Sequence, residues 1–552
     1  MNYRVQPPQS PPPIFMDIER AMRSGQMPRA IDLACKALDA GHEDPVLYNL
    51  RAHGRRRDGR LDEALDDLRR ANALDPRSAR ILSEMANCLN AMGRYRQAEK
   101  AAGEAIDRDA SLAEAWFHRA FALEMLNELE PARQGYLEAL RLDPRIADAP
   151  ARLASLAELR GETDEARKFA EQSLAIQPRH PVATLMLANL DLGQGDLASA
   201  EARLRPVLSD PNAQALVGAN ALCCLADIRD AQGRYGEAFR IYRDALWNWK
   251  ASFAPRFSRP DGIGAVDIVR QSAAVISQVE VPAQAAVRTA TARGTHPRLA
   301  FIMGFPRSGT TLLGQVLASH PGVSLSEERP LLARAIAELS DPVEGLPRLA
   351  TLSEEEIDVY RADFWERAAN HGLDLNREVL VEQTAFNTAY LPLIARLFPQ
   401  ARIVFAVRDP RDVVLSCFRR LFAPNHFTLE LATLEGAAAF YDATMRLAET
   451  CRTKFDLAVL EIRNEDLIAD FDGQTRHLCA HLGIDWRETL RDFHKDTARR
   501  TLITRSAAQV RRGLRADGVA VWRRYGEELS PVLPMLEPWV ARFGYEPAQP
   551  AP

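Results

Sequence analysis

The sequence lacks the features that mark membrane, disulfide-rich and nucleic-acid-binding proteins. Its 552 residues contain no run of about 18 or more apolar residues, so we expect no membrane span. The seven cysteines are scattered and include no Cys-x-x-Cys pair, which argues against a zinc site or a disulfide framework. The net charge of −5 provides no basic surplus for general nucleic-acid binding. We therefore expect reduced thiols, no metal and no nucleic-acid partner.

The N-terminus lacks the apolar segment of a signal peptide. It reads MNYRVQPPQSPPP, and its prolines disfavour a packed structure. We interpret residues 1–14 as a disordered Pro-rich leader and expect a cytoplasmic protein. The chain is also too long for one hydrophobic core, so we expect at least two domains.

A repeat with a period of 34 residues fills the first half of the chain. A residue suited to left-handed backbone recurs at this spacing, and an alanine follows five residues after each one. The left-handed positions are Gly25, Gly59, Gly93, Asn127, Gly161 and Gly195, with Gly233 in a last block after a four-residue insertion. The alanines are Ala30, Ala64, Ala98, Ala132, Ala166, Ala200 and Ala238, and prolines share the period at Pro76, Pro144 and Pro178.

This pattern predicts two helices in each unit. The glycine or asparagine allows a sharp turn after the first helix, the alanine keeps the second helix thin where it crosses, and the proline ends it. The pattern resembles the tetratricopeptide repeat (TPR) family over residues 15–250. The resemblance implies an α-solenoid whose groove binds a peptide or protein. If the chain is an enzyme, the bound protein could be its substrate. Arg55, Arg56 and Arg57 either line that groove or form a solvated helix face. Residues 251–297 are interpreted as a linker with packing helices.

An apolar run at residues 299–304 predicts a buried parallel strand that runs into a phosphate loop and then a helix. Such a loop aims backbone N–H groups and a helix N-terminus at one point, which makes an anion site. Gly304 and Gly309 have the spacing of a nucleotide-kinase loop, but Thr310 stands where that loop has lysine, which argues against ATP or GTP hydrolysis. The loop residues are Pro306, Arg307, Ser308, Gly309, Thr310 and Thr311.

A second strand is expected at residues 401–407, followed by Arg408 and by a helix that carries Ser416. Pro410 suits the first turn of that helix. We predict an α/β domain with a mostly parallel sheet, and a ligand at the carboxyl ends of its strands. Alternatively, Arg408 and Asp412 form a structural ion pair.

The stretch GFPRSGTTLLGQVLASHPGVSLSEE resembles the phosphosulfate loop of sulfotransferases that use 3′-phosphoadenosine-5′-phosphosulfate (PAPS). The resemblance covers residues 298–545 and is strongest to the protein-tyrosine branch and its bacterial TPR-fused relatives. It implies that the loop holds the 5′-phosphosulfate, that Arg408 and Ser416 hold the 3′-phosphate, and that no metal is needed. It also implies Glu328 as the catalytic base.

Further roles follow from the same resemblance. Arg307 is expected to act in catalysis as well as in binding. Ser506, in a Ser-x-x-Gln-Val sequence, is expected to donate to the nucleotide or sulfuryl group, with Trp522 at the family spacing. Arg511 and Arg512 either reach the cofactor or are solvated. In the small-molecule branch the base is a histidine, for which the stand-ins are His371 and His426, whereas His320 is expected to be structural.

Three positions depart from the family pattern: Gln383 replaces a lysine, Asn464 a tyrosine and Val521 a basic residue. They leave open a second hypothesis, a TPR scaffold with a degenerate sulfotransferase-like domain. A third, a nucleotide kinase, is disfavoured by Thr310. For an active enzyme, protein tyrosine is the leading acceptor, with sugars and small phenols open.

Overall fold

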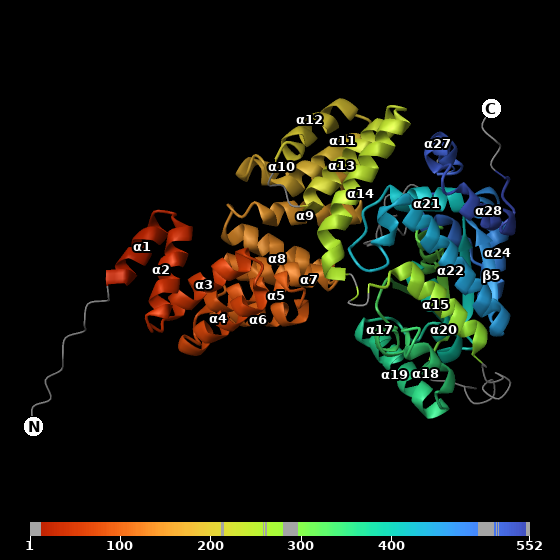
Figure 1. Ribbon diagram of the computed structural model, residues 1–552, viewed down its shortest axis with the longest axis horizontal. Helices are drawn as coiled ribbons and strands as arrows, with labels where there is room; N and C mark the ends of the chain where they lie inside the picture. Colours follow the sequence, from red (N-terminus) through yellow and green to blue (C-terminus); the bar gives the residue numbers. More distant parts are fainter. Residues whose placement is uncertain are drawn as a thin grey trace, which may run out of the picture. The chain divides into compact units, whose positions relative to one another are not determined.

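The computed structural model describes residues 13–210, 215–257, 259, 262–279, 296–494, 513–514, 516 and 518–547 (Figure 1). Residues 1–12 of the expected leader lie outside these ranges, as do Ser506, Arg511 and Arg512. The chain divides into two compact units, residues 1–158 with 162–187 and residues 159–161 with 188–552. The predicted domain bounds themselves stay predictions.

The first half of the chain is helical, as the repeat predicts. Its helices are α1 Pro13–Arg23, α2 Met27–Asp39, α3 Pro45–Arg57, α4 Leu61–Leu74, α5 Ala79–Ala91, α6 Tyr95–Arg108, α7 Ala113–Met125, α8 Leu129–Leu142, α9 Asp148–Arg160, α10 Thr163–Ile176, α11 Pro181–Gly193, α12 Leu197–Leu208, α13 Ala215–Ala231 and α14 Tyr235–Phe257.

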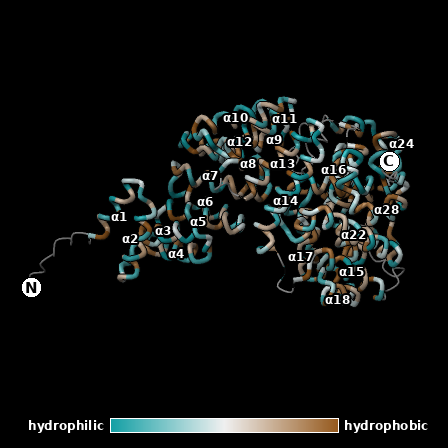
Figure 2. The backbone as a smooth tube through the Cα atoms, turned by 45° about the horizontal axis from the view of Figure 1, so that its top comes forward, coloured by the Kyte–Doolittle hydropathy of each residue, from teal (hydrophilic) through white to brown (hydrophobic). Residues whose placement is uncertain are grey.

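The turn residues and the alanines of the repeat have the backbone conformation and the burial that the sequence predicts. All seven predicted left-handed positions have positive φ, between 64° at Asn127 and 83° at Gly195, and each lies between the two helices of a hairpin. All seven alanines are fully buried. Along the repeat helices hydrophobic and hydrophilic residues alternate (Figure 2), because one face of each helix packs against its neighbours. Arg55 lies 2.7 Å from the buried Asp67 and is therefore partly used within the array.

The second unit contains a five-stranded sheet with strand order β2-β3-β1-β4-β5, and all four strand pairings are parallel. The predicted fold class, helical repeats followed by α/β, is confirmed. The strands are β1 Arg298–Gly304, β2 Val323–Glu327, β3 Val379–Gln383, β4 Arg402–Val407 and β5 Ala458–Arg463. The helices are α15 Ala265–Gln278, α16 Thr310–Ala318, α17 Ala333–Leu339, α18 Gly345–Thr351, α19 Glu354–Asn370, η2 Ala385–Tyr390, α20 Leu391–Leu397, α21 Pro410–Phe418, η3 Glu430–Ala432, α22 Leu434–Lys454, α23 Asn464–Ala469, α24 Phe471–Leu482, η4 Glu488–Asp492, η5 Val521–Tyr525, α27 Gly526–Leu529 and α28 Leu533–Arg542.

Helices cover both faces of this sheet. One face packs Ala300, Ile302 and their neighbours against α16 and α24. The other packs Phe301 and Met303 against a larger core, which includes residues of α19, α20, α21 and α22. The helices of the last repeat, α13 and α14, contribute to this larger core. The carboxyl ends of all five strands therefore share one edge, where a ligand site is expected in such folds.

All seven cysteines are free thiols. Among the described residues, no group of three or more His, Cys, Asp or Glu side chains is placed to bind a metal ion. In that part of the chain no helix combines the length and apolar character needed to cross a membrane.

Candidate active site

The predicted phosphate loop joins β1 to α16 in the expected strand–loop–helix order. Gly304 and Gly309 have φ of 158° and 107°, and a Cβ on Gly304 would lie 2.6 Å from both the Ala406 oxygen and the Ser308 Oγ. Only glycine fits this position. Arg307 also has positive φ, 71°, which is uncommon for a residue with a side chain. The loop is therefore held in a strained, tightly packed conformation, as is common at ligand sites.

The two predicted phosphate sites are brought together. The Arg307 Nε donates to the Ser416 Oγ at 3.1 Å, and the Arg408 Nη1 donates to the Arg307 carbonyl at 3.2 Å. The Cys417 Sγ, also on α21, donates to the Pro306 carbonyl at 3.2 Å. These contacts follow from the topology, because β1 and β4 are adjacent parallel strands whose ends lie side by side.

The alternative that Arg408 and Asp412 form an ion pair does not describe the observed contacts. The Asp412 carboxylate accepts from the backbone N–H groups of Ala520 at 2.7 Å and Trp522 at 2.8 Å. Burial raises the pKa of Asp412 to about 6, and the nearby Arg408 opposes this rise. Arg408 instead donates through Nη2 to the Gly518 carbonyl at 2.5 Å. Residues 518–525, called the C-terminal segment below, are thus held against the start of α21.

Arg411 lies in the first turn of α21, close to the second loop. It is 2 % exposed and forms a bidentate pair with Asp409, with Nε–Oδ1 of 2.9 Å and Nη2–Oδ2 of 2.7 Å. Its guanidinium lies over the Trp522 ring, 4.0 Å from the centroid. Arg411 is therefore used in packing, and Arg307 and Arg408 are the cations at the two loops.

The candidate base Glu328 directly follows β2. Its backbone N–H donates to the Gln383 carbonyl at 3.0 Å, so the β2–β3 ladder continues to this residue, and its φ is 48°.

 That backbone hydrogen bond from Glu328 to Gln383 fixes the position of the residue at the sheet edge. The side chain reaches solvent, yet the protein around it removes enough water to raise the pKa of its carboxyl above the ordinary value. A carboxylate with a raised pKa at the open edge of the sheet has the properties of a general base.

A second carboxyl group near Glu328 was missed by the sequence analysis. Glu382, on β3, is 2 % exposed and accepts from the Thr384 Oγ1 at 2.7 Å and from the Asn387 amide. Burial, with a smaller contribution from the charge of Glu328, raises the pKa of Glu382 to about 8. Glu328 therefore ionises first and Glu382 keeps its proton at neutral pH. A glutamate inside an apolar strand, Val-Leu-Val-Glu-Gln, was the available signal.

The three departures from the family pattern all lie close to the site or its supports. Gln383 is fully buried, and neither its Oε1 nor its Nε2 has a hydrogen-bond partner among the described residues. Its Oε1 would lie 3.0 Å from a Cβ on Gly314 of α16. Asn464 faces the phosphate loop, because its Oδ1 would lie 3.0 Å from a Cβ added to Gly309. Val521 begins η5, beside Trp522.

The remaining candidates separate into structural and untested residues. His320 is structural, as expected: its Nε2 lies 2.8 Å from the Asp485 carbonyl, and its Nδ1 accepts from the Gly322 N–H at 3.0 Å. His371 ends α19, and its carbonyl accepts from Arg329. Burial lowers the pKa of His426, which packs on Phe427. The roles of Ser506 and Arg512 stay predictions because both lie outside the described residues.

The site fits a ligand with two phosphate-type groups. The Ser308 Oγ and the Arg408 Nε are buried without a partner among the described residues, as are both amide atoms of Gln383. Buried polar atoms of this kind are rare unless something else satisfies them. Thr310 and Thr311 form the first turn of α16, whose N-terminus faces the loop and favours an anion. Each anion-binding loop also carries an arginine.

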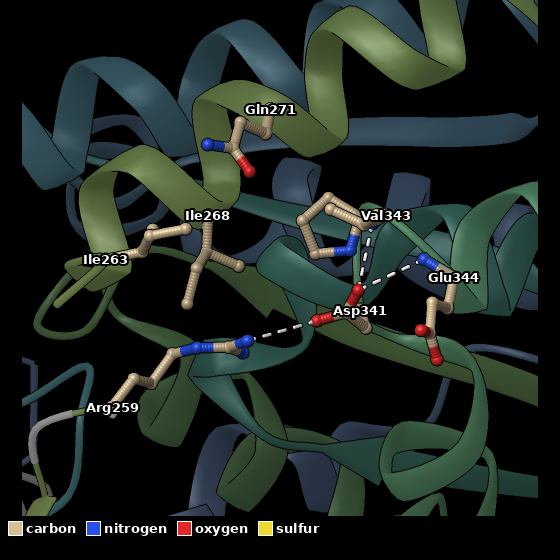
Figure 3. A pocket seen from close by; sticks show the side chains of 8 residues that line it. Arg259, Ile263, Ile268, Gln271, Asp341, Val343 and Glu344 are labelled. Atoms are coloured by element: carbon tan, nitrogen blue, oxygen red, sulfur yellow. Dashed lines mark hydrogen bonds and ion pairs between the residues drawn. The ribbon is translucent and has the colours of Figure 1, made fainter. Parts of the chain in front are cut away.

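A different pocket, of about 350 Å³, lies elsewhere in the second unit (Figure 3). It is lined by Arg259, residues of α15 and the loop 341–344, and by none of the residues predicted for the site. Within it the Asp341 carboxylate accepts from the backbone N–H groups of Val343 and Glu344 and lies 3.4 Å from Arg259. Its polar groups therefore serve the local loop structure.

The fold and the site together define a helical-repeat protein joined to an α/β domain with two candidate anion-binding loops at one sheet edge. Residues 298–488 match the sulfotransferase family, and residues 56–116 and 157–219 match tetratricopeptide repeats. The chain thus carries tetratricopeptide repeats followed by a sulfotransferase-family domain.

Individual relatives are distant. An uncharacterized protein of Aquifex aeolicus is 28% identical over 270 residues, which cover 47% of this chain and 35% of that protein. Protein-tyrosine sulfotransferase 1 of Danio rerio is 26% identical over 267 residues, which cover 45% of this chain and 72% of that protein. Protein-tyrosine sulfotransferase A of Caenorhabditis elegans is 24% identical over 259 residues, which cover 45% of this chain and 67% of that protein. A solved tetratricopeptide repeat protein from Parabacteroides merdae has a TM-score of 0.33 at 22% identity, covering 42% of this chain and 90% of that one.

Proposed function

We propose that the protein transfers a sulfuryl group from PAPS to an acceptor hydroxyl. The single observation that carries the proposal is the contact between the two anion loops, in which Arg307 bonds Ser416 and Arg408 bonds the Arg307 backbone. In this proposal one cation serves each of two adjacent phosphate groups. This arrangement suits a nucleotide with phosphate at both its 5′ and its 3′ side, and the missing loop lysine disfavours a nucleoside triphosphate.

In this proposal PAPS supplies the activated sulfuryl group, and the residues of this chain bind and orient the reactants. The backbone N–H groups at the start of α16, the Thr310 and Thr311 hydroxyls and Arg307 stabilise negative charge at the 5′ side. Arg408 and Ser416 bind the 3′-phosphate. Gln383 donates from its amide, a neutral substitute for the lysine of the family. Glu328 takes the proton from the acceptor hydroxyl.

Protein tyrosine is the acceptor that we propose. A phenol has a pKa near 10, so a carboxylate with a raised pKa is better matched to it than an ordinary glutamate. Phe386 is on the same short helix as Asn387, the partner of Glu382. Phe386 stacks on Phe427 with ring centroids 5.6 Å apart. The repeat array would bind the acceptor protein or a partner that presents it.

The direct test measures transfer of labelled sulfate from PAPS to a tyrosine-containing peptide. Glu328→Gln should remove transfer and leave binding of 3′-phosphoadenosine-5′-phosphate (PAP) intact, because the substitution keeps the shape of the side chain. Glu355→Gln, at an exposed position on α19, is the control. Unchanged turnover in Glu328→Gln would remove Glu328 from the mechanism.

The second candidate is a repeat scaffold with an inactive domain, and the buried Gln383 is the observation that favours it. Restoring the family lysine with Gln383→Lys distinguishes the two. Transfer that appears only in the substituted protein would establish that the natural chain is inactive.

A further inference from the structure

The last repeat hairpin, α13–α14, packs inside the second unit. Tyr242 and Trp249 of α14 belong to the same buried core as Phe418 at the end of α21. Phe239 of α14 contacts Phe418 with ring centroids 5.0 Å apart, and Tyr235 contacts Tyr525 of η5 at 5.5 Å. This hairpin is therefore part of the framework of the sulfotransferase-family domain and more than a terminal repeat of the array.

A charged network accompanies the aromatic packing. Asp227 and Asp230 of α13 face two arginines that directly follow α21. The Arg420 Nη1 lies 2.8 Å from the Asp227 Oδ2, and the Arg419 Nη2 lies 3.0 Å from the Asp230 Oδ2. The side chain of Arg419 is only 14% exposed and that of Asp230 17%. Charges this sheltered from water interact strongly, and the loss of one partner leaves the other desolvated.

Two tyrosine hydroxyls complete the network. The Tyr242 hydroxyl donates to Asp227 and accepts from Arg419, whose Nη2 lies 3.2 Å away. The Tyr525 hydroxyl donates to Asp230. Both carboxylates of α13 are thus bound to the arginines that follow α21, and Asp230 is also bound, through Tyr525, to the C-terminal segment.

The same two elements form the 3′ side of the proposed nucleotide site. Helix α21 carries Ser416, three residues before Arg419. The C-terminal segment is fastened to α21 by Asp412, which binds the backbone of Ala520 and Trp522. Arg408 bonds both this segment, at Gly518, and the phosphate loop, at Arg307. A shift of α21 or of the segment would therefore move Ser416 and Arg408.

We propose that Asp227 and Asp230 are positioning residues for the nucleotide site, so that the last repeat sets the geometry in which Arg408 and Ser416 bind the 3′-phosphate. The inference rests on the proposed function. If these residues had a purely structural role, a variant that remains folded would bind the nucleotide with unchanged affinity. A positioning role predicts that the affinity of the folded variant changes.

The experiment titrates the full-length protein with PAP by calorimetry, well below the midpoint of thermal unfolding of each variant. Asp230→Asn should weaken PAP binding about tenfold, a factor typical of coupling between separate sites. Asp230→Glu, which keeps the charge, should recover part of the affinity. Asp244→Asn, at an exposed position on α14, is the matched control and should bind as the natural protein does.

If Asp230→Asn fails to fold, Tyr525→Phe provides the test, because it removes only the hydroxyl that binds Asp230. Weaker PAP binding by a folded Tyr525→Phe protein supports the inference. Equal affinity in the folded variants overturns it while the proposed function stands. A natural protein that does not bind PAP at all overturns the proposed function, and this inference with it.

Discussion

The Nε of Arg307 donates to the Oγ of Ser416 at 3.1 Å across 109 positions of sequence. The first residue belongs to the loop after β1 and the second to the helix after β4. Because these strands are neighbours, the contact joins two elements that the sequence separately predicts to bind anions.

Ser416→Ala should weaken PAP binding by about 1.5–3 kcal/mol, the contribution of a hydrogen bond to a charged group. Calorimetric titration measures the loss. Affinity for ADP, which has no 3′-phosphate, should change little. A similar loss for both nucleotides would mean that Ser416 acts only by positioning Arg307. Ser277→Ala, at an exposed position on α15, serves as the control.

Gln383→Leu should separate stability from activity. Both amide atoms of Gln383 are buried without a described partner, so an apolar side chain of similar size should leave the free energy of unfolding unchanged or increase it. Transfer should fall by about 10²–10³, as for the loss of one oxyanion-type donor. Denaturant unfolding and the peptide assay measure the two effects. If Gln383→Leu lowered the free energy of unfolding and left transfer unchanged, the Gln383 amide would have a structural role only.

The rate of transfer should rise with pH as Glu328 ionises. Burial raises the pKa of Glu328, so the ascending limb should lie above the value of about 4.3 for an ordinary glutamate. Glu382→Gln should leave this limb in place, because Glu382 is still protonated when Glu328 ionises. A limb that moves in Glu382→Gln would show that the two carboxyls titrate in the opposite order.

Stability should also depend on Glu382. Its pKa is about 8 in the folded protein, whereas an unfolded glutamate loses its proton near about 4.3. Between these values the folded state binds more protons, so the free energy of unfolding should fall as pH rises through this window. Glu382→Gln should flatten the fall, measured by denaturant unfolding at several pH values. A slope equal to that of the natural protein would contradict the assignment.

Two helix glycines in the repeat array should respond oppositely to alanine. A Cβ on Gly135 of α8 would lie 2.9 Å from the Ala120 Cβ, so Gly135→Ala should cost about 1–3 kcal/mol through overpacking. Gly103 of α6 has only the Arg119 Nε nearby, at 3.9 Å, so Gly103→Ala should stabilise the array by about 0.5–1 kcal/mol. Thermal unfolding measures both, and equal shifts would contradict the packing described for α7 and α8.

The sequence predicted features that depend on local patterns. The glycine and alanine period located the turns and buried contacts of the repeats, and the strand–loop–helix order located both anion loops. Contacts between distant segments had no such signal. Asp227 and Arg420 meet across 193 positions, and each taken alone resembles an ordinary surface charge. The protonated state of Glu382 depends on burial and on a neighbouring charge, which only the fold supplies.

The central claim is that Arg408 and Ser416 bind a 3′-phosphate. Calorimetric titration of the natural protein with PAP, with ADP as the control ligand, tests it most directly. PAP should bind more tightly than ADP, and Arg408→Ala should remove this preference. Equal binding of the two nucleotides, or no binding of PAP, would contradict the account and favour the repeat scaffold with an inactive domain.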